Sequence, residues 1–319
     1  MSNNYRVEYE LSDDDENIHH KWDNSIEPVL TVEPGEVVRF ECRDALDGQL
    51  TPDSTADDFE NVSFDPVHPL TGPVAIDGAE PGDVLAVEFL DFEHKGWGYT
   101  GYMPGEMGYG LLPEEFEDGG LYVWDLGDDV AHFVNDIEVP LNLFPGIGGV
   151  APKTPGAHNT LPPRDTGGNM DLTYLTAGST LYLPVEVAGA LFSTGDCHAA
   201  QGDGEVCVTG IEAPMFVTAR FDVLKDKSIA QPELETSGST THTNPADPAY
   251  GTTGIADSLM TAMKRAVSHM ISHLEAERDL TRGEAYILCS AALSLKISEV
   301  VGAPNWTVTA YLPDSIFPE

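Results

Sequence analysis

Short stretches of alternating apolar and polar residues recur along most of the chain, separated by glycine, proline and acidic residues that favour turns. In residues 85–89 leucine, valine and phenylalanine alternate with alanine and glutamate, which is the period of a half-buried strand. Similar stretches predict strands over residues 29–32, 37–42, 121–126, 131–141 and 215–224. So many short strands divided by turns indicate a mainly β protein.

The pattern changes near the C-terminus, where apolar residues from Leu259 to Leu274 recur at helical spacing. A second helix is predicted to begin with Thr281 and Glu284, a capping box in which each side chain satisfies the other residue's backbone amide. Helix stop signals place its end near Gly302. We therefore predict a mainly β fold, with an antiparallel β-sandwich-like core and a C-terminal helical pair.

The same features suggest how the chain is divided. Residues 1–18 are expected to form an acidic N-terminal arm, and residues 19–319 a single interlocked domain. Within that domain we expect a β core over residues 19–227, a polar connector over 228–252, and the helical pair with a last strand over 253–319.

Residues 193–212 fit neither pattern, because they place acidic, amide and imidazole side chains among glycines and alanines. The potential metal ligands and proton carriers are Asp196, His198, Gln201, Asp203, Glu205 and Glu212. The glycines let the backbone turn sharply and let a small ligand approach the main chain. Because apolar residues recur from Val206 to Ile211, we expect a strand that leaves the cluster at the mouth of a sheet.

The charge of the chain narrows its possible partners. It has 15 Lys and Arg against 54 Asp and Glu, a formal net charge of −39. We therefore expect neither nucleic acid nor a membrane as a partner, since phosphate binding depends on clustered Lys and Arg. The acidic residues are spread over the whole length, and concentrated salt screens their repulsion. This favours a halophilic source with a salt-rich cytoplasm.

The cysteines and the N-terminus bear on the compartment. The four cysteines contain no CxxC pair, so neither a disulfide framework nor a zinc site made of cysteines alone is expected. The first residues are polar and acidic, unlike a signal peptide. No apolar run approaches the roughly 18 residues that span a bilayer. We expect a cytoplasmic protein.

Several longer motifs resemble one known family. The run GDCHAAQGDGEV at residues 195–206 is similar to the signature of the acetamidase/formamidase family, and residues 163–192 resemble the segment before that signature. The resemblance extends over nearly all of residues 19–317. It implies a sandwich-like β fold, a homo-oligomer, and metal-assisted hydrolysis of short aliphatic amides to a carboxylate and ammonia.

Two further segments resemble the family. Residues 145–152, PGIGGVAP, lack the lysine and the following helix of a phosphate-binding P-loop, so we predict a close-packed turn. Asn169 and Asp171 follow two glycines and can bind either the substrate amide or the side chains around the metal ligands. His68, in the run HPLTGP, is a third candidate for substrate contact.

A metal-bound water is the nucleophile that these residues favour. A divalent cation lowers the pKa of a bound water to about 7 and polarises the amide carbonyl. Asp196 and His198 are two residues apart and project to the same side of an extended backbone. We choose Asp44, just past a predicted strand, as the third ligand. Zinc is the expected ion, with calcium as the alternative.

The remaining polar residues of the cluster are candidates for proton transfer. Glu205, Glu212 and Gln201 form the predicted catalytic group, with Glu205 as the general base and Glu212 in support. Small residues at 199 and 200 predict a small substrate, but the motif does not distinguish formamide from acetamide.

Two alternatives remain open. Cys197 can serve as a nucleophile, although Asp196 beside it would raise the pKa of its thiol. A glycine-rich Asp-x-His loop also occurs in non-catalytic metal-binding or sugar-binding β-sandwich modules. Release of ammonia from a simple amide distinguishes an enzyme from such a module.

Overall fold

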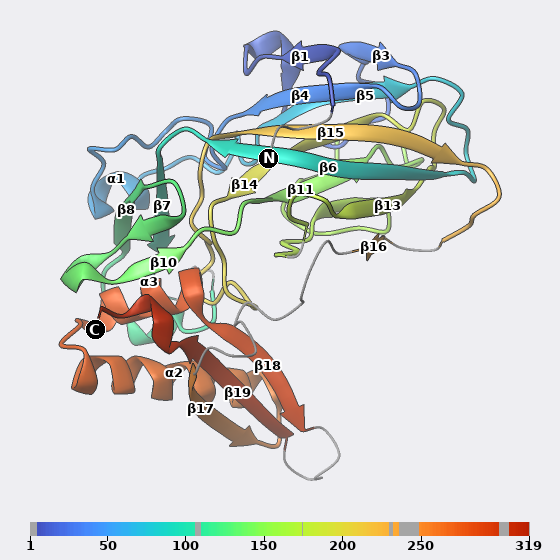
Figure 1. The fold of residues 1–319 in the computed structure, drawn as a ribbon. Helices are drawn as coiled ribbons and strands as arrows, with labels where there is room; N and C mark the ends of the chain where they lie inside the picture. Colours follow the sequence, from blue (N-terminus) through green and yellow to red (C-terminus); the bar gives the residue numbers. More distant parts are fainter. Residues whose placement is uncertain are drawn as a thin grey trace.

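The computed structural model describes residues 5–105, 110–173, 175–229, 232–235, 249–299 and 306–318. Within these residues, two large sheets form the upper body of the molecule and smaller sheets lie beside and below them (Figure 1). The connector expected at 228–252 lies largely outside the described residues.

The first sheet has the strand order β1-β4-β15-β6-β13-β16. Its strands are Tyr9–Leu11 (β1), Val37–Cys42 (β4), Met215–Leu224 (β15), Val84–His94 (β6), Thr180–Pro184 (β13) and Glu233–Glu235 (β16). Neighbouring strands pair antiparallel, except that β1 is parallel to β4. Strand β1 lies within the acidic arm expected at residues 1–18, so residues 9–11 of that arm are part of the sheet.

The second sheet has the order β12-β11-β14-β5-β2, and a further strand, β3, pairs with β5. Its strands are Gly167–Asn169 (β12), Phe144–Val150 (β11), Phe192–His198 (β14), Leu70–Ile76 (β5), Ile18–His19 (β2) and Leu30–Val32 (β3). Every residue of β11, β14 and β5 is buried, which explains why these strands show no alternation. The turn predicted at residues 145–152 is therefore wrong over residues 145–150, which belong to β11.

The two sheets pack face to face around aromatic side chains. Phe192 of β14 contacts Phe40 of β4 and Phe221 of β15, with ring centroids 5.9 Å and 5.3 Å apart. All three side chains are fully buried. Alternate residues of each inner face fill the space between packed sheets. The predicted antiparallel, sandwich-like β core is confirmed.

A third sheet lies beside the sandwich, with the order β10-β9-β8-β7. Its strands are Trp97–Tyr102 (β7), Gly120–Leu126 (β8), Val130–His132 (β9) and Glu138–Pro140 (β10). A short helix, Ala56–Glu60 (α1), contacts β8 and was not predicted. The Thr55 backbone amide donates to the Asp58 carboxylate over 2.8 Å at its start. One-turn 3₁₀ helices occur at Asp15–Asn17, Pro113–Glu115, Val134–Asp136 and Asp314–Ile316.

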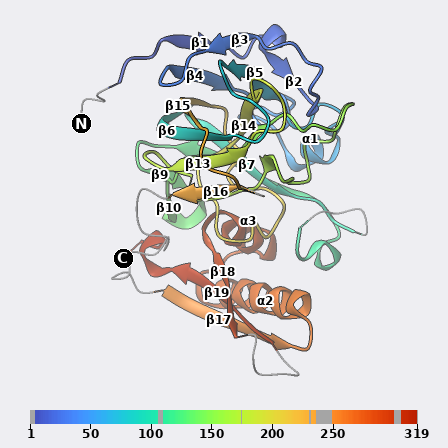
Figure 2. The ribbon, with the colours of Figure 1, turned by 90° about the vertical axis from the view of Figure 1, so that its right-hand side faces the viewer.

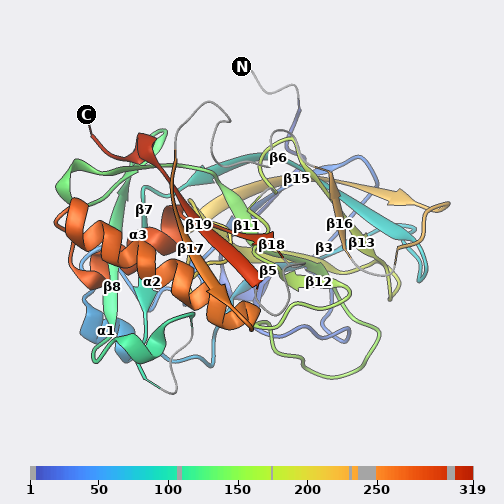
Figure 3. The same cartoon turned by 90° about the horizontal axis from the view of Figure 1, so that it is seen from below.

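The C-terminal unit lies below the sandwich (Figure 2). It consists of Ala249–Ala256 (β17), Leu259–Glu277 (α2), Arg282–Ala292 (α3), Ser294–Glu299 (β18) and Trp306–Pro313 (β19). The strands pair in the order β17-β19-β18, and α2 lies along this sheet, against β17 and β19 (Figure 3). None of the helices in the described parts of the chain is long and apolar enough to cross a membrane.

The helical pair was predicted correctly, apart from one boundary. The capping box at the start of α3 is present, because the Thr281 backbone amide donates to the Glu284 carboxylate over 2.8 Å. The predicted end near Gly302 is wrong, since the helix ends at Ala292. Residues 294–299 instead pair with β19, and this sheet pairing overrides the helical spacing.

Candidate active site

The polar cluster lies where β14 of the sandwich meets β7 of the third sheet. Glu212 joins the two, because its backbone bridges both His198 at the end of β14 and Tyr99 in β7. Tyr99 and Glu212 exchange two backbone hydrogen bonds of 2.9 Å and 2.8 Å. The side chains of His198 and Glu212 are thus positioned by paired strands, which hold a site more rigidly than a free loop.

Between His198 and Glu212 the chain forms a series of turns, so the strand predicted over residues 206–211 is wrong. Glu205 and Val208 have φ angles of 40° and 96°, and a β-branched residue rarely adopts a positive φ. Helix α3 holds this loop in place. The Tyr286 hydroxyl donates to the Val206 carbonyl over 2.6 Å, and the Ser290 hydroxyl donates to the Thr209 carbonyl.

His198 is the centre of the cluster. Its Nε2 lies 3.1 Å from Glu212 Oε2 and 3.7 Å from Asp196 Oδ1. Its Nδ1 lies 2.6 Å from Gln201 Oε1 and 3.8 Å from Glu205 Oε1. The amide oxygen of Gln201 can only accept a hydrogen bond, so Nδ1 carries the proton that it donates to Gln201. Gln201 therefore orients the ring, with Nε2 facing the carboxylates.

Burial changes the protonation of the acidic residues. It raises the pKa of Glu212 to about 8 and that of Asp171 to about 7, because a buried carboxylate loses its hydration. Burial and the neighbouring Asp171 carboxylate raise the pKa of Glu205 well above its ordinary value. Burial alone would lower the pKa of His198, but the Glu212 and Asp196 carboxylates outweigh it and raise that pKa. The site is therefore suited to holding protons or another cation.

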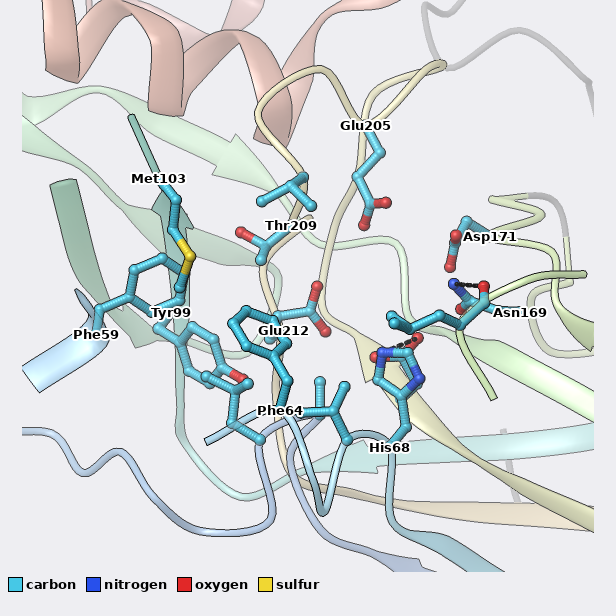
Figure 4. A pocket seen from close by; sticks show the side chains of 16 residues that line it. Phe59, Phe64, His68, Tyr99, Met103, Asn169, Asp171, Glu205, Thr209 and Glu212 are labelled. Carbon is cyan, nitrogen blue, oxygen red and sulfur yellow. Dashed lines mark hydrogen bonds and ion pairs between the residues drawn. The ribbon is translucent and has the colours of Figure 1, made fainter. Parts of the chain in front are cut away.

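A pocket of about 160 Å³ opens on this cluster (Figure 4). The three predicted substrate contacts, His68, Asn169 and Asp171, all line it, as do Asp196, Glu205 and Glu212. His68 Nδ1, Asn169 Oδ1 and Asp171 Oδ1 are buried without a hydrogen-bond partner among the described residues. Buried polar atoms are nearly always paired, so these atoms indicate a place for a ligand.

The structure does not bring Asp44, the predicted third metal ligand, to the pocket wall. Its carboxylate accepts hydrogen bonds from the backbone amides of Leu46 and Gly48, at 3.0 Å and 2.8 Å, and from the Tyr99 hydroxyl at 3.3 Å. These bonds hold the turn that carries Ala45 and Leu46 to the pocket. Asp44 thus has a structural role of the kind that aspartates often have in turns.

Among the residues that the structure describes, two overlapping groups of side chains can hold a metal ion. One is Asp171, Asp196 and His198, the other is His198, Glu205 and Glu212, and in each the ligand atoms lie within 4.8 Å of one another. His198 belongs to both groups, and its Nε2 lies at ion-pair distance from Glu212 Oε2. Gly146 makes room for the first group, because a Cβ there would lie 2.8 Å from Asp171 Oδ1 and 3.0 Å from Asp196 Oδ2.

Cys197 has neither the position nor the electrostatics of a nucleophile. Its side chain is fully buried and does not line the pocket. The neighbouring Cys42 thiol and burial raise the pKa of Cys197 well above its ordinary value, which disfavours the reactive thiolate. Ala199 and Ala200 are likewise buried away from the pocket, so the argument from their size to a small substrate is wrong.

The side of the pocket opposite the acidic residues was not predicted. It is formed by Leu46, Phe59, Phe64, Val67, Met103 and Leu161, together with Tyr99. Phe59 lies on α1, and the only sequence signal for that helix is the spacing of Thr55 and Asp58. The other residues carry no local signal, because only the packing of distant segments brings them together.

The chain matches the acetamidase/formamidase family over residues 5–156 and 154–319. It belongs to this family. The amidase is 27% identical to the formamidase of Methylophilus methylotrophus, over 95% of this chain and 90% of that protein. It is 30% identical to the acetamidase of Mycolicibacterium smegmatis, over 70% of this chain and 68% of that protein. The expected activity class, hydrolysis of amide C–N bonds, is thereby confirmed.

Solved structures resemble the whole chain. The gamma lactamase from Delftia acidovorans is 27% identical, with a TM-score of 0.90 over 98% of this chain and 94% of that one. The acetamidase from Bacillus halodurans is 31% identical, with a TM-score of 0.67 over 95% of this chain and 97% of that one. The amidase therefore shares its fold with enzymes named for linear and for cyclic amides.

Proposed function

We propose that this amidase hydrolyses short linear amides, such as formamide and acetamide, with the help of a divalent metal ion. The names of its curated relatives support the substrates. The observation that carries the proposal is the grouping of Asp171, Asp196 and His198, whose ligand atoms lie within 4.8 Å of one another, with Asp171 Oδ1 buried and without a hydrogen-bond partner among the described residues. Unpaired buried acceptors are costly, so they favour a bound cation.

The residues that would hold the ion are Asp171, Asp196 and His198. Asp171 thus takes the place that we expected for Asp44. One imidazole and carboxylate oxygens suit zinc, whereas calcium prefers six to eight oxygen ligands. When bound, such an ion supplies Lewis acidity, which polarises an amide carbonyl and makes a nearby water more acidic. Gln201 accepts a hydrogen bond from Nδ1–H of His198, which keeps Nε2 free to bind the ion.

Glu205 is the residue that we propose as the general base. It lines the pocket, and burial with the nearby Asp171 raises its pKa well above the ordinary value. A carboxylate with a raised pKa holds the proton of the attacking water more strongly and can then return it to the leaving group. Glu205 accepts the proton of the attacking water and donates it to the amide nitrogen as the C–N bond breaks. The products are the carboxylate and ammonia.

Asn169 and His68 can hold the amide group of the substrate. The Asn169 side-chain nitrogen donates to the Leu161 carbonyl over 3.1 Å, so its unpaired oxygen faces the pocket as an acceptor. An amide NH₂ group supplies the donor that this oxygen lacks. His68 Nδ1 is also buried and unpaired beside the same space. A substrate that pairs these atoms is fixed in orientation before the reaction.

Ammonia release from formamide and acetamide tests the proposal, measured before and after dialysis against a chelator and after zinc is added back. We expect activity that is lost on chelation and restored by zinc. Full activity in protein shown to be metal-free would contradict the metal, while leaving the amide substrates. Binding of zinc without turnover of either amide would contradict the enzyme and favour a non-catalytic binding module.

A second candidate function is the opening of a γ-lactam, because the structure superposes on the Delftia gamma lactamase with a TM-score of 0.90. A five-membered lactam such as 2-pyrrolidinone is a cyclic amide, and its hydrolysis gives an amino acid rather than ammonia. Formation of a primary amine from 2-pyrrolidinone therefore tests this function separately. No amine formation by protein that hydrolyses acetamide would exclude it.

A further inference from the structure

The pocket has two chemically different sides. Figure 4 shows Phe59, Tyr99 and Met103 on one side and Glu205 and Asp171 on the other. The apolar side is completed by Leu46, Val67 and Leu161, with Phe64 at its edge. An ion and an amide group occupy only the polar side, so the apolar side needs an apolar part of the ligand.

The apolar side is a fixed surface. Leu46, Phe59, Val67 and Tyr99 belong to a hydrophobic cluster separate from the main sandwich core. Phe59 is 3% exposed, and its ring lies against Gly101, where an added Cβ would come within 2.5 Å of it. Close packing of this kind leaves little freedom to collapse into the pocket when no ligand is present. The volume of the pocket is therefore available to a substrate.

The size of the pocket indicates the size of that substrate. Its volume is about 160 Å³. An apolar cavity of about 150 Å³ binds benzene, a molecule of about six non-hydrogen atoms. An amide of about that size, such as isobutyramide, places its NH₂ and carbonyl groups against the polar side and its branched hydrocarbon group against the apolar side. Formamide and acetamide leave most of the apolar surface without a contact.

We infer, on the basis of the proposed amide hydrolysis, that the apolar side is an acyl-binding site. It favours amides with a compact, branched hydrocarbon group over formamide and acetamide. Met103 and Phe64 are the residues that set the limit of this site. Met103 directly follows β7, and Phe64 lies at the rim, where it is 42% exposed. Benzamide, with about nine non-hydrogen atoms, exceeds the size that a benzene-sized cavity accepts.

The test is a series of kcat/KM values for formamide, acetamide, propionamide, isobutyramide and benzamide, measured by ammonia release. Each carbon that enters the apolar side is expected to raise kcat/KM by about tenfold, since one methylene in an apolar pocket gives about 10- to 200-fold discrimination. Isobutyramide should therefore be the best substrate of the series and benzamide a poor one. A constant or falling kcat/KM from formamide to isobutyramide would overturn the inference. Absence of ammonia from every amide would instead overturn the proposed hydrolysis.

Substitution of the limiting residues gives a second test. Met103→Trp fills the acyl site, so the ratio of kcat/KM for isobutyramide over formamide should fall by about tenfold. Met260→Trp is the matched control, because Met260 is 53% exposed on α2, and its ratio should equal that of the wild type. An unchanged ratio in folded Met103→Trp would overturn the inference. Phe64→Ala changes an exposed side chain and should raise the ratio of kcat/KM for benzamide over that for isobutyramide. This second variant keeps the test valid if Met103→Trp does not fold.

Discussion

His198 Nε2 lies 3.1 Å from Glu212 Oε2, the distance of an ion pair when Nε2 carries a proton. Both side chains are buried. Leaving a buried donor or acceptor unpaired costs about 1–3 kcal/mol, and more for a charged group. Nε2 therefore needs either that proton or another cation, and the metal ion that we propose would take the place of the proton on His198. Folding and chemistry make opposite demands at this position, as is common in active sites.

Glu205→Gln should lower kcat by about 10²- to 10⁴-fold, because glutamine has nearly the same size but cannot take the proton of the attacking water. Its metal content should stay that of the wild type, since the proposed ligands are Asp171, Asp196 and His198. Asp203→Asn is the matched control in the same loop and should keep wild-type kcat. Loss of metal in Glu205→Gln would show that Glu205 is a ligand rather than the base.

Cys197→Ser should retain most of the activity, because the thiol is buried, has a raised pKa and does not line the pocket. Cys289→Ser serves as the control for the effect of serine at another fully buried cysteine. Ammonia release per folded protein should be similar in both variants. An inactive but folded Cys197→Ser protein with full metal would move the chemistry to the thiol.

The fold was largely predictable because several strands, such as β4 and β13, alternate buried with partly exposed residues. In β4, buried residues alternate with half-exposed ones, and the strand was predicted at its correct position. Strands β11 and β14 are buried on both faces, so their sequences carry no period of two. The end of α3 was missed because the following residues have a helical spacing of apolar side chains but pair with β19. Local pattern cannot reveal such long-range pairing.

The candidate site divides in the same way. Asp196, His198 and Glu212 lie within one short segment, so their clustering was visible in the sequence. Asp171 was identified as a substrate contact rather than as a metal ligand. Its carboxylate comes close to that of Asp196 only because Gly146 has no side chain, and the sequence does not reveal this contact. The failure of Asp44 as a ligand has a local cause, since the amides of its own turn occupy its carboxylate. The apolar side of the pocket comes from distant segments and had no sequence signal.

His19 gives a prediction about pH that is independent of the chemistry. Its side chain is half-buried, with Nδ1 2.9 Å from the Lys21 carbonyl and Nε2 2.8 Å from the Ser193 hydroxyl. Burial lowers its pKa from 6.5 to about 4. Between these values the unfolded chain binds a proton that the folded chain does not, so stability falls as the pH decreases through this window. The free energy of unfolding therefore falls by about 3 kcal/mol when the pH is lowered through the whole window.

The check is urea unfolding of the wild type and of His19→Gln on both sides of this window. The wild type should lose about 3 kcal/mol more stability than the variant when the pH is lowered, because glutamine cannot take up the proton. Ser12→Ala, at a half-buried residue that does not titrate, serves as the control and should follow the wild type. Equal losses in all three proteins would contradict the assignment of this titration to His19.

The net charge of −39 predicts that stability depends on salt. Repulsion between the acidic side chains destabilises the folded state, and at about 1 M salt the Debye length falls to about 3 Å. The midpoint of thermal unfolding, followed by circular dichroism, should therefore rise as KCl is added. A neutral osmolyte at equal osmolality is the control. A midpoint that does not change with KCl would contradict adaptation to a salt-rich cytoplasm.

The most direct test of the proposed chemistry is to measure bound metal and ammonia release together in the wild type, in His198→Ala and in His269→Ala. His269 is exposed on α2 and serves as the control for the loss of an imidazole. We expect the wild type and His269→Ala to bind zinc and release ammonia from acetamide. Folded His198→Ala should do neither, because it lacks the nitrogen ligand. An active wild type that contains no metal, or a His198→Ala variant that keeps both metal and turnover, would contradict the account.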